Sequence, residues 1–104
     1  MVIVSVFYPL APETNFDMAY YVDSHLPLVQ RLLEPMGMRQ STVLRGMSSG
    51  SGGAPAFGVI AELSFDDADS MAAALAAHGP ETQADIPNFT DSVPIIQISE
   101  VIAN

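Results

Sequence analysis

The order of strand-like and helix-like segments constrains this chain most. Strand-like runs occupy residues 2–8, 38–46, 56–65 and 93–102, and a helical segment follows the first and the third of them. The order β-α-β-β-α-β is the ferredoxin-like arrangement, in which an antiparallel sheet carries both helices on one face. We therefore predict an α+β fold, and a length of 104 residues fits a single domain over residues 1–104.

The segment 56–65, AFGVIAELSF, is the strongest strand candidate. Its side chains alternate in polarity, so one face should bear Phe57, Val59, Ala61, Leu63 and Phe65. The segment 38–46 is more polar, and we expect it at an edge of the sheet.

The first helix has recognisable start and stop signals. Thr14 and Asp17 have the spacing of a capping box, which predicts a start at Asn15 or Phe16, and Gly37 should end the helix. At 100° per residue, one apolar stripe contains Met18, Val22, Leu26, Val29, Leu33 and Met36.

The second helix should begin in the segment SFDDADS, capped by Ser64 or Asp66, and end at Gly79. Pro80 then suits the first turn of another short helical piece. His78 would lie in the last turn, where the helix dipole favours a cation, and we prefer this interpretation to a catalytic one.

The second face of the sheet is expected to be apolar in part. It should bear Ile3, Phe7, Ile60 and Ile95, whereas a face exposed to water alternates to polar residues. No segment of the chain remains to cover it, so we predict a homodimer. Glu62 and Gln97 lie in mid-strand, where they could line a cavity or make polar contacts across the subunit interface.

Charge and cysteine content exclude several classes of function. Twelve acidic residues oppose three basic ones, for a net charge of −9, so nucleic acid and anionic membranes are not expected partners. The absence of cysteine excludes thiolate catalysis, zinc–thiolate sites and iron–sulfur clusters. Two distant histidines lack metal-ligand spacing, so we expect no metal. Without a signal peptide or an apolar run of membrane-spanning length, we expect a cytoplasmic protein.

The segment 19–29, AYYVDSHLPLV, contains the main candidate site. Tyr21 and His25 are one helical turn apart on the same flank, whereas Tyr20 points away and is expected outside the site. Pro27 lacks an N–H, and its ring would clash with the carbonyl of Asp23, so the helix should bend there and leave carbonyls free.

His25 can exchange protons near neutral pH, and the Tyr21 hydroxyl can donate to a developing oxyanion. The structural alternative is a half-buried His25 bonded to a carbonyl that Pro27 leaves free, and the sequence leaves both interpretations open.

The segments YYVDSHLPLV and DIPNFTDSVPIIQISEVI together resemble the EthD family of small proteins. His25 and Tyr21 match the first motif of that family, and Pro87, Asn88 and Phe89 match the second. The resemblance implies a ferredoxin-like subunit that dimerises through its sheet into an α/β barrel. Members are often labelled reductases, and the wider group of dimeric α/β barrels includes cofactor-free monooxygenases, lactone isomerases, decarboxylases and haem proteins.

These observations lead to a hypothesis of function. A pocket between sheet and helices would bind a small apolar or aromatic molecule, with His25 as acid/base and Tyr21 as hydrogen-bond donor, and would need no cofactor. The candidate substrate-binding residues are Asn88, which could orient a substrate carbonyl, and Phe89, Phe7 and Tyr8.

The reaction would be an oxidation, a reduction or an isomerisation in catabolism or secondary metabolism. A non-catalytic ligand-binding or accessory protein is the alternative. A haem protein is the third alternative, with His25 as axial ligand and only Arg31 near enough for a propionate.

Overall fold

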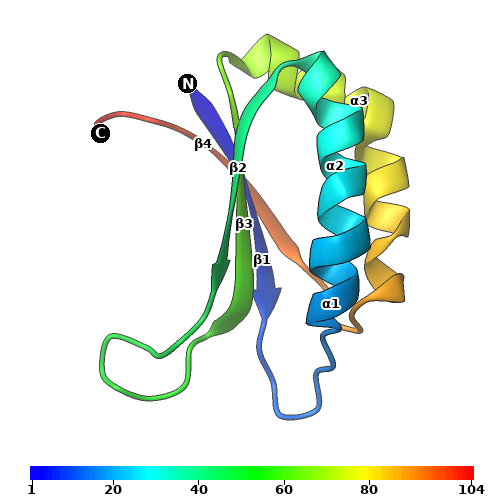
Figure 1. Ribbon diagram of the computed structural model, residues 1–104. Helices are drawn as coiled ribbons and strands as arrows, with labels where there is room; N and C mark the ends of the chain where they lie inside the picture. Colours follow the sequence, from blue (N-terminus) through cyan, green and yellow to red (C-terminus); the bar gives the residue numbers. More distant parts are fainter.

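The computed structural model describes residues 1–104 and confirms the ferredoxin-like fold. Its elements are β1 (Val2–Pro9), α1 (Met18–Tyr20), the π-helical turn η1 (Tyr21–His25), α2 (Leu26–Leu33), η2 (Glu34–Met36), β2 (Met38–Arg45), β3 (Phe57–Phe65), α3 (Ala68–Ala84), η3 (Ile86–Asn88) and β4 (Ile95–Glu100). The antiparallel sheet has the order β2-β3-β1-β4, and the helices lie on one side of it (Figure 1).

The core lies between the sheet and the two long helices. Val4, Leu63 and Phe65 of the central strands pack with side chains of α2 and α3, among them Leu33 and Met71. The predicted inward row of β3 is correct from Val59 to Phe65, because alternate residues face the helices.

Phe57 departs from that row. The pairing of β1 with β3 runs from Tyr8 with Val59 to Pro9 with Phe57, so the register passes over Gly58. This bulge turns Phe57 to the other face, where its ring centroid lies 5.1 Å from that of Phe7.

The first helix begins at Met18, later than predicted. Its N-cap is Asp17, whose carboxylate accepts the Tyr20 N–H at 3.0 Å. The predicted Thr14 cap is wrong, because the Thr14 N–H donates to the Ala11 carbonyl in a turn and Phe16 forms a β-bridge with Thr90. The predicted end is correct, since Gly37 follows η2 with a φ of 110°.

A π-helical turn precedes Pro27 in place of a break. In η1 the Leu26 N–H donates to the Tyr21 carbonyl, five residues back, and Pro27 falls in the first turn of α2, where a missing N–H costs little. The wide turn changes which residues face the core. Val22 was predicted in the apolar stripe but is 50% exposed, whereas Tyr21 and His25 are 1% and 5% exposed.

The second helix is longer than predicted at its C-terminal end and starts at a different cap. Asp67 is the N-cap and accepts the Ser70 N–H at 2.7 Å, because Ser64 still belongs to β3 and Asp66 bonds Arg39. The helix then continues through Gly79 and Pro80 to Ala84.

The Thr82 hydroxyl donates to the carbonyls of His78 and Gly79 beside the proline, at 3.1 and 3.0 Å. His78 is therefore not in the last turn, and the predicted interaction with the helix end is wrong.

The outer face of the sheet carries one apolar row and one polar row. The strand pairings align Leu44, Ile60, Phe7 and Ile95 across all four strands, and Leu44 and Ile95 are 45% and 54% exposed. The adjacent row consists of Thr42, Glu62, Ser5 and Gln97. No helix covers this face (Figure 1).

None of the helices combines the length and apolar character needed to cross a membrane. No three His, Cys, Asp or Glu side chains gather where they could hold a metal ion.

Candidate functional site

A cavity of about 150 Å³ lies between the sheet and helices α2 and α3. Eleven of its fifteen lining residues are hydrophobic. They come from both helices and three strands, and include Val4, Val6, Leu26, Val29, Leu33, Ala61, Leu63, Leu75 and Ile96. The lining residues on α3 that are not hydrophobic are Gly79, Thr82 and Gln83.

Tyr8, Tyr21 and His25 bring polar groups to this cavity. The rings of Tyr21 and His25 stack with centroids 5.5 Å apart, and the Tyr8 ring lies 6.0 Å from that of Tyr21. The two hydroxyls and the His25 Nε2 make no hydrogen bond within the chain, yet no fully buried side-chain nitrogen or oxygen lacks a partner. These three groups therefore remain accessible and can bond a ligand.

The Nδ1 of His25 is held by a carboxylate. It lies 2.9 Å from Oδ2 of Asp85, at the end of α3, and the two side chains are only 7% and 13% exposed. Because an ionised carboxylate only accepts hydrogen bonds, Nδ1 carries the proton in the neutral ring and Nε2 keeps its lone pair. The predicted alternative partner for His25, a carbonyl freed by Pro27, is wrong.

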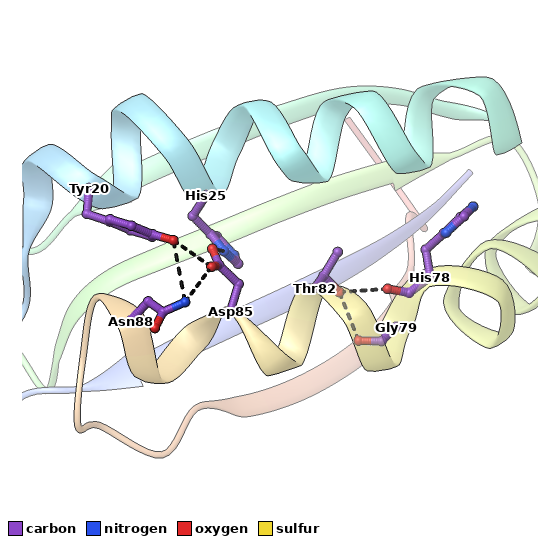
Figure 2. A network of polar contacts seen from close by, with 7 residues as sticks. All are labelled: Tyr20, His25, His78, Gly79, Thr82, Asp85 and Asn88. Atoms are coloured by element: carbon purple, nitrogen blue, oxygen red, sulfur yellow. Dashed lines mark hydrogen bonds and ion pairs between the residues drawn. The ribbon is translucent and has the colours of Figure 1, made fainter.

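Asp85 is the centre of a small polar network (Figure 2). Its Oδ1 accepts the Tyr20 hydroxyl at 2.7 Å and the Asn88 amide at 2.9 Å. Burial raises the pKa of Asp85, but the hydrogen bonds from Tyr20, Asn88 and His25 outweigh burial, so the pKa lies below its ordinary value. Asp85 therefore stays ionised beside His25 at neutral pH.

Two residues of this network were missed or misplaced by the sequence analysis. Tyr20 was expected outside the site, but its hydroxyl supports Asp85. Asp85 was not singled out, although it opens the segment DIPNFT three residues before Asn88. The signal available in the sequence was an acidic residue directly before the Ile-Pro pair that follows the end of the helix.

The two tyrosines at the cavity stay protonated. Burial raises the pKa of Tyr8 to about 12. Burial, with a smaller contribution from Tyr8, raises the pKa of Tyr21 above its usual range as well. Both hydroxyls can therefore donate to an oxyanion at neutral pH.

The other predicted substrate-binding residues do not line the cavity. Phe89 is 3% exposed and packs behind the site, with its ring centroid 4.6 Å from that of His25. Asn88 bonds Asp85 and does not reach the cavity. Phe7 lies on the outer face of the sheet, because its neighbours in β1, Val6 and Tyr8, face the helices.

A second cavity of about 240 Å³ shares Tyr8 as a wall. Its other lining residues include Leu10, Thr14, Phe16 and Arg45. His25 and Tyr21 do not line it, so the candidate acid/base chemistry belongs to the first cavity.

Comparison with known proteins identifies the family. The EthD domain matches residues 13–92, which include both Tyr20 and Asp85. An EthD-like protein from Ralstonia eutropha JMP134 is 40% identical, with a TM-score of 0.88 over 98% of this chain and 92% of the other. An ethyl tert-butyl ether degradation (EthD) family protein from Bacillus halodurans C-125 is 23% identical, with a TM-score of 0.78 over 98% and 99%.

SnoaB from Streptomyces nogalater, a cofactor-independent oxygenase, shares the fold at 14% identity, with a TM-score of 0.66 over 99% of this chain and 93% of the other. Among curated proteins none matches the chain. The domain match over residues 13–92 and the 40% identity establish that this chain belongs to the EthD family.

Proposed function

We propose that the chain is a small-molecule enzyme that moves a proton within its substrate and needs no cofactor. The proposal rests on the hydrogen bonding of the two ring nitrogens of His25. Its Nδ1 is bonded to Asp85, while Nε2 has no partner in the chain and the ring lines an apolar cavity. A positioned imidazole in such a setting suits general-base catalysis.

In the proposed step, Nε2 of His25 takes a proton from a C–H bond beside a substrate carbonyl. The bonding electrons move to the carbonyl oxygen, and the hydroxyl of Tyr8 or Tyr21 donates to the resulting enolate oxygen. The Asp85 carboxylate stabilises the imidazolium, as in other carboxylate–histidine pairs. Where the substrate is a β,γ-unsaturated carbonyl compound, this enolate is a dienolate, and return of the proton from His25 to its γ carbon moves the double bond into conjugation and completes an isomerisation.

An oxidation could begin with the same enolate, but it would also need an electron acceptor such as dioxygen. Isomerisation needs only the groups that line the cavity, so we prefer it. The oxygenase activity of SnoaB is an analogy at the level of fold, which does not determine a reaction.

Ligand binding without catalysis is the second candidate, and the mostly hydrophobic lining of the cavity favours it. A haem does not suit the site. The cavity of about 150 Å³ is small for a macrocycle of four pyrrole rings, and Arg31 is exposed on α2 and does not line it.

We also propose that a second copy of the chain covers the outer face of the sheet. The apolar row of Leu44, Ile60, Phe7 and Ile95 supports this, since two such rows can bury each other across a twofold axis. The neighbouring polar row, with Glu62 and Gln97, would supply hydrogen bonds that fix the register.

Deuterium exchange tests the proton transfer directly. In D2O the wild-type protein should catalyse the exchange of deuterium into the carbons beside the carbonyl of a ring ketone such as cyclohexanone. NMR should show that this exchange is faster with the protein than in buffer alone. His25→Gln should abolish the increase. His78→Gln, which changes the other histidine outside the cavity, should not. If His25→Gln exchanges as fast as wild type, His25 is not the base.

A further inference from the structure

We infer that the substrate is a neutral molecule of a single six-membered ring with one oxygen substituent, and that Gly79 sets the size limit. The inference names the substrate class for the site described above and rests on the proposed function. Size, charge, polarity and the wall at Gly79 each contribute to it.

The volume of the cavity limits the ligand to one ring. An apolar cavity of about 150 Å³ can hold a molecule the size of benzene. A fused bicyclic compound is substantially larger than benzene, and the surrounding core is packed too closely to make room for it without cost.

The charges around the cavity select a neutral ligand. No Lys, Arg, Asp or Glu lines it, so neither an anion nor a cation would find a permanent opposite charge there. A charged group would lose its hydration without compensation. An anion would also be repelled by the ionised Asp85 behind His25.

The two ends of the cavity differ in character. Tyr8 and Tyr21, which carry hydroxyls, line the cavity and belong to one buried cluster together with Phe89. Val29 and Leu33 belong to the other buried cluster and present only hydrocarbon. A ring therefore lies against the aliphatic end, with its oxygen at the tyrosines and His25.

Gly79 lines the cavity, and the space where its side chain would lie is empty. It is buried within α3, yet a methyl group added there would meet no heavy atom within 4 Å outside its own helix backbone and chain neighbours. The other two glycines with open space around them, Gly50 and Gly52, lie in the exposed loop between β2 and β3. Glycine destabilises a helix interior relative to alanine, so the space beside Gly79 is retained at the expense of helix stability.

Pro80 offers a competing reason for this glycine. The proline ring clashes with a Cβ on the residue before it, so Gly79 also relieves strain at the proline. Pro80 is exposed, which allows the two explanations to be separated in a Pro80→Ala background.

The experiment compares binding of three probes by NMR titration of the backbone amides: phenol, 2-naphthol and benzoate. The proteins are wild type, Pro80→Ala, Gly79→Ala/Pro80→Ala and Ala73→Leu/Pro80→Ala. Ala73 lies on the exposed side of α3, so its variant controls for added bulk on the helix.

We expect phenol to bind wild type, Pro80→Ala and the Ala73 control alike. It should bind Gly79→Ala/Pro80→Ala at least about tenfold more weakly, the cost of one misplaced methyl group in an apolar pocket. 2-Naphthol and benzoate should shift no resonance of residues at the cavity. Binding of 2-naphthol at the cavity, binding of benzoate there, or an unchanged phenol affinity in the Gly79 variant would each overturn the inference.

The two proposals fail in different ways. If 2-naphthol binds while His25-dependent deuterium exchange is present, the substrate class is wrong and the proton transfer stands. If phenol binds as expected but no ring ketone exchanges deuterium, the cavity is a binding site of the inferred size and the enzyme proposal is wrong.

Discussion

Asp85 Oδ2 lies 2.9 Å from Nδ1 of His25, although 60 residues separate them in the chain. The contact joins the end of α3 to the π-helical turn and leaves the other imidazole nitrogen available at the cavity. One carboxylate thereby fixes both the orientation and the tautomer of the candidate base.

Asp85→Asn should impair proton transfer while preserving the shape of the site. The amide can donate to Nδ1, which would move the ring proton to Nε2 and remove the basic lone pair from the cavity. We expect the rate of deuterium exchange to fall by about a hundredfold or more. Asp66→Asn, which changes an exposed acid that pairs with Arg39, is the matched control and should exchange at the wild-type rate.

Asp85 should also contribute to stability in a pH-dependent manner. Its pKa is lower in the folded protein than in the unfolded chain, so its contribution is present above the unfolded pKa of about 4 and is lost as the pH falls through the folded value. Urea unfolding of wild type and Asp85→Asn should therefore show a difference at pH 7 that shrinks toward pH 3. A difference that grows as the pH falls would contradict the direction of the pKa shift.

Tyr21→Phe should separate function from stability. Because the Tyr21 hydroxyl has no partner in the chain, removing it should change the free energy of unfolding by less than about 1 kcal/mol. The rate of exchange should fall if the hydroxyl stabilises the enolate. Chemical denaturation and the exchange assay on the same sample measure both quantities, and a stable variant with full activity would remove Tyr21 from the mechanism.

Ile95→Lys should yield a monomer if a second copy covers the outer face. The lysine would place a charge in the apolar row beside Phe7, where burial in an interface is costly. Ala73→Lys makes the same change of charge on the exposed side of α3 and should leave the oligomeric state unchanged. Sedimentation velocity measures both, and a wild-type protein that sediments as a monomer would refute the dimer.

The strands and the inward row of β3 were predictable because alternation in polarity is local to each segment. The errors arose where single residues change the register. The bulge at Gly58 turns Phe57 to the outer face, and the π turn exposes Val22. Neither the bulge nor the π turn produces a periodic pattern of polarity in the sequence.

The candidate site was predictable only in part. Tyr21 and His25 follow from helical spacing, since they lie four residues apart. The bond from Tyr20 to Asp85 spans 65 residues, and its existence depends on where α3 ends. The predicted end at Gly79 was six residues before Asp85, so the sequence did not place this carboxylate beside the first helix.

The π turn has a further consequence for how this site can change. A π turn is an α-helix with one additional residue, so deleting a residue from 21–25 would restore regular helical phase. The segment before the deletion would then rotate by about 100° relative to α2, carrying Tyr20 away from Asp85. Insertion and deletion, more than substitution, would therefore switch this network on or off while leaving the core face of α2 intact.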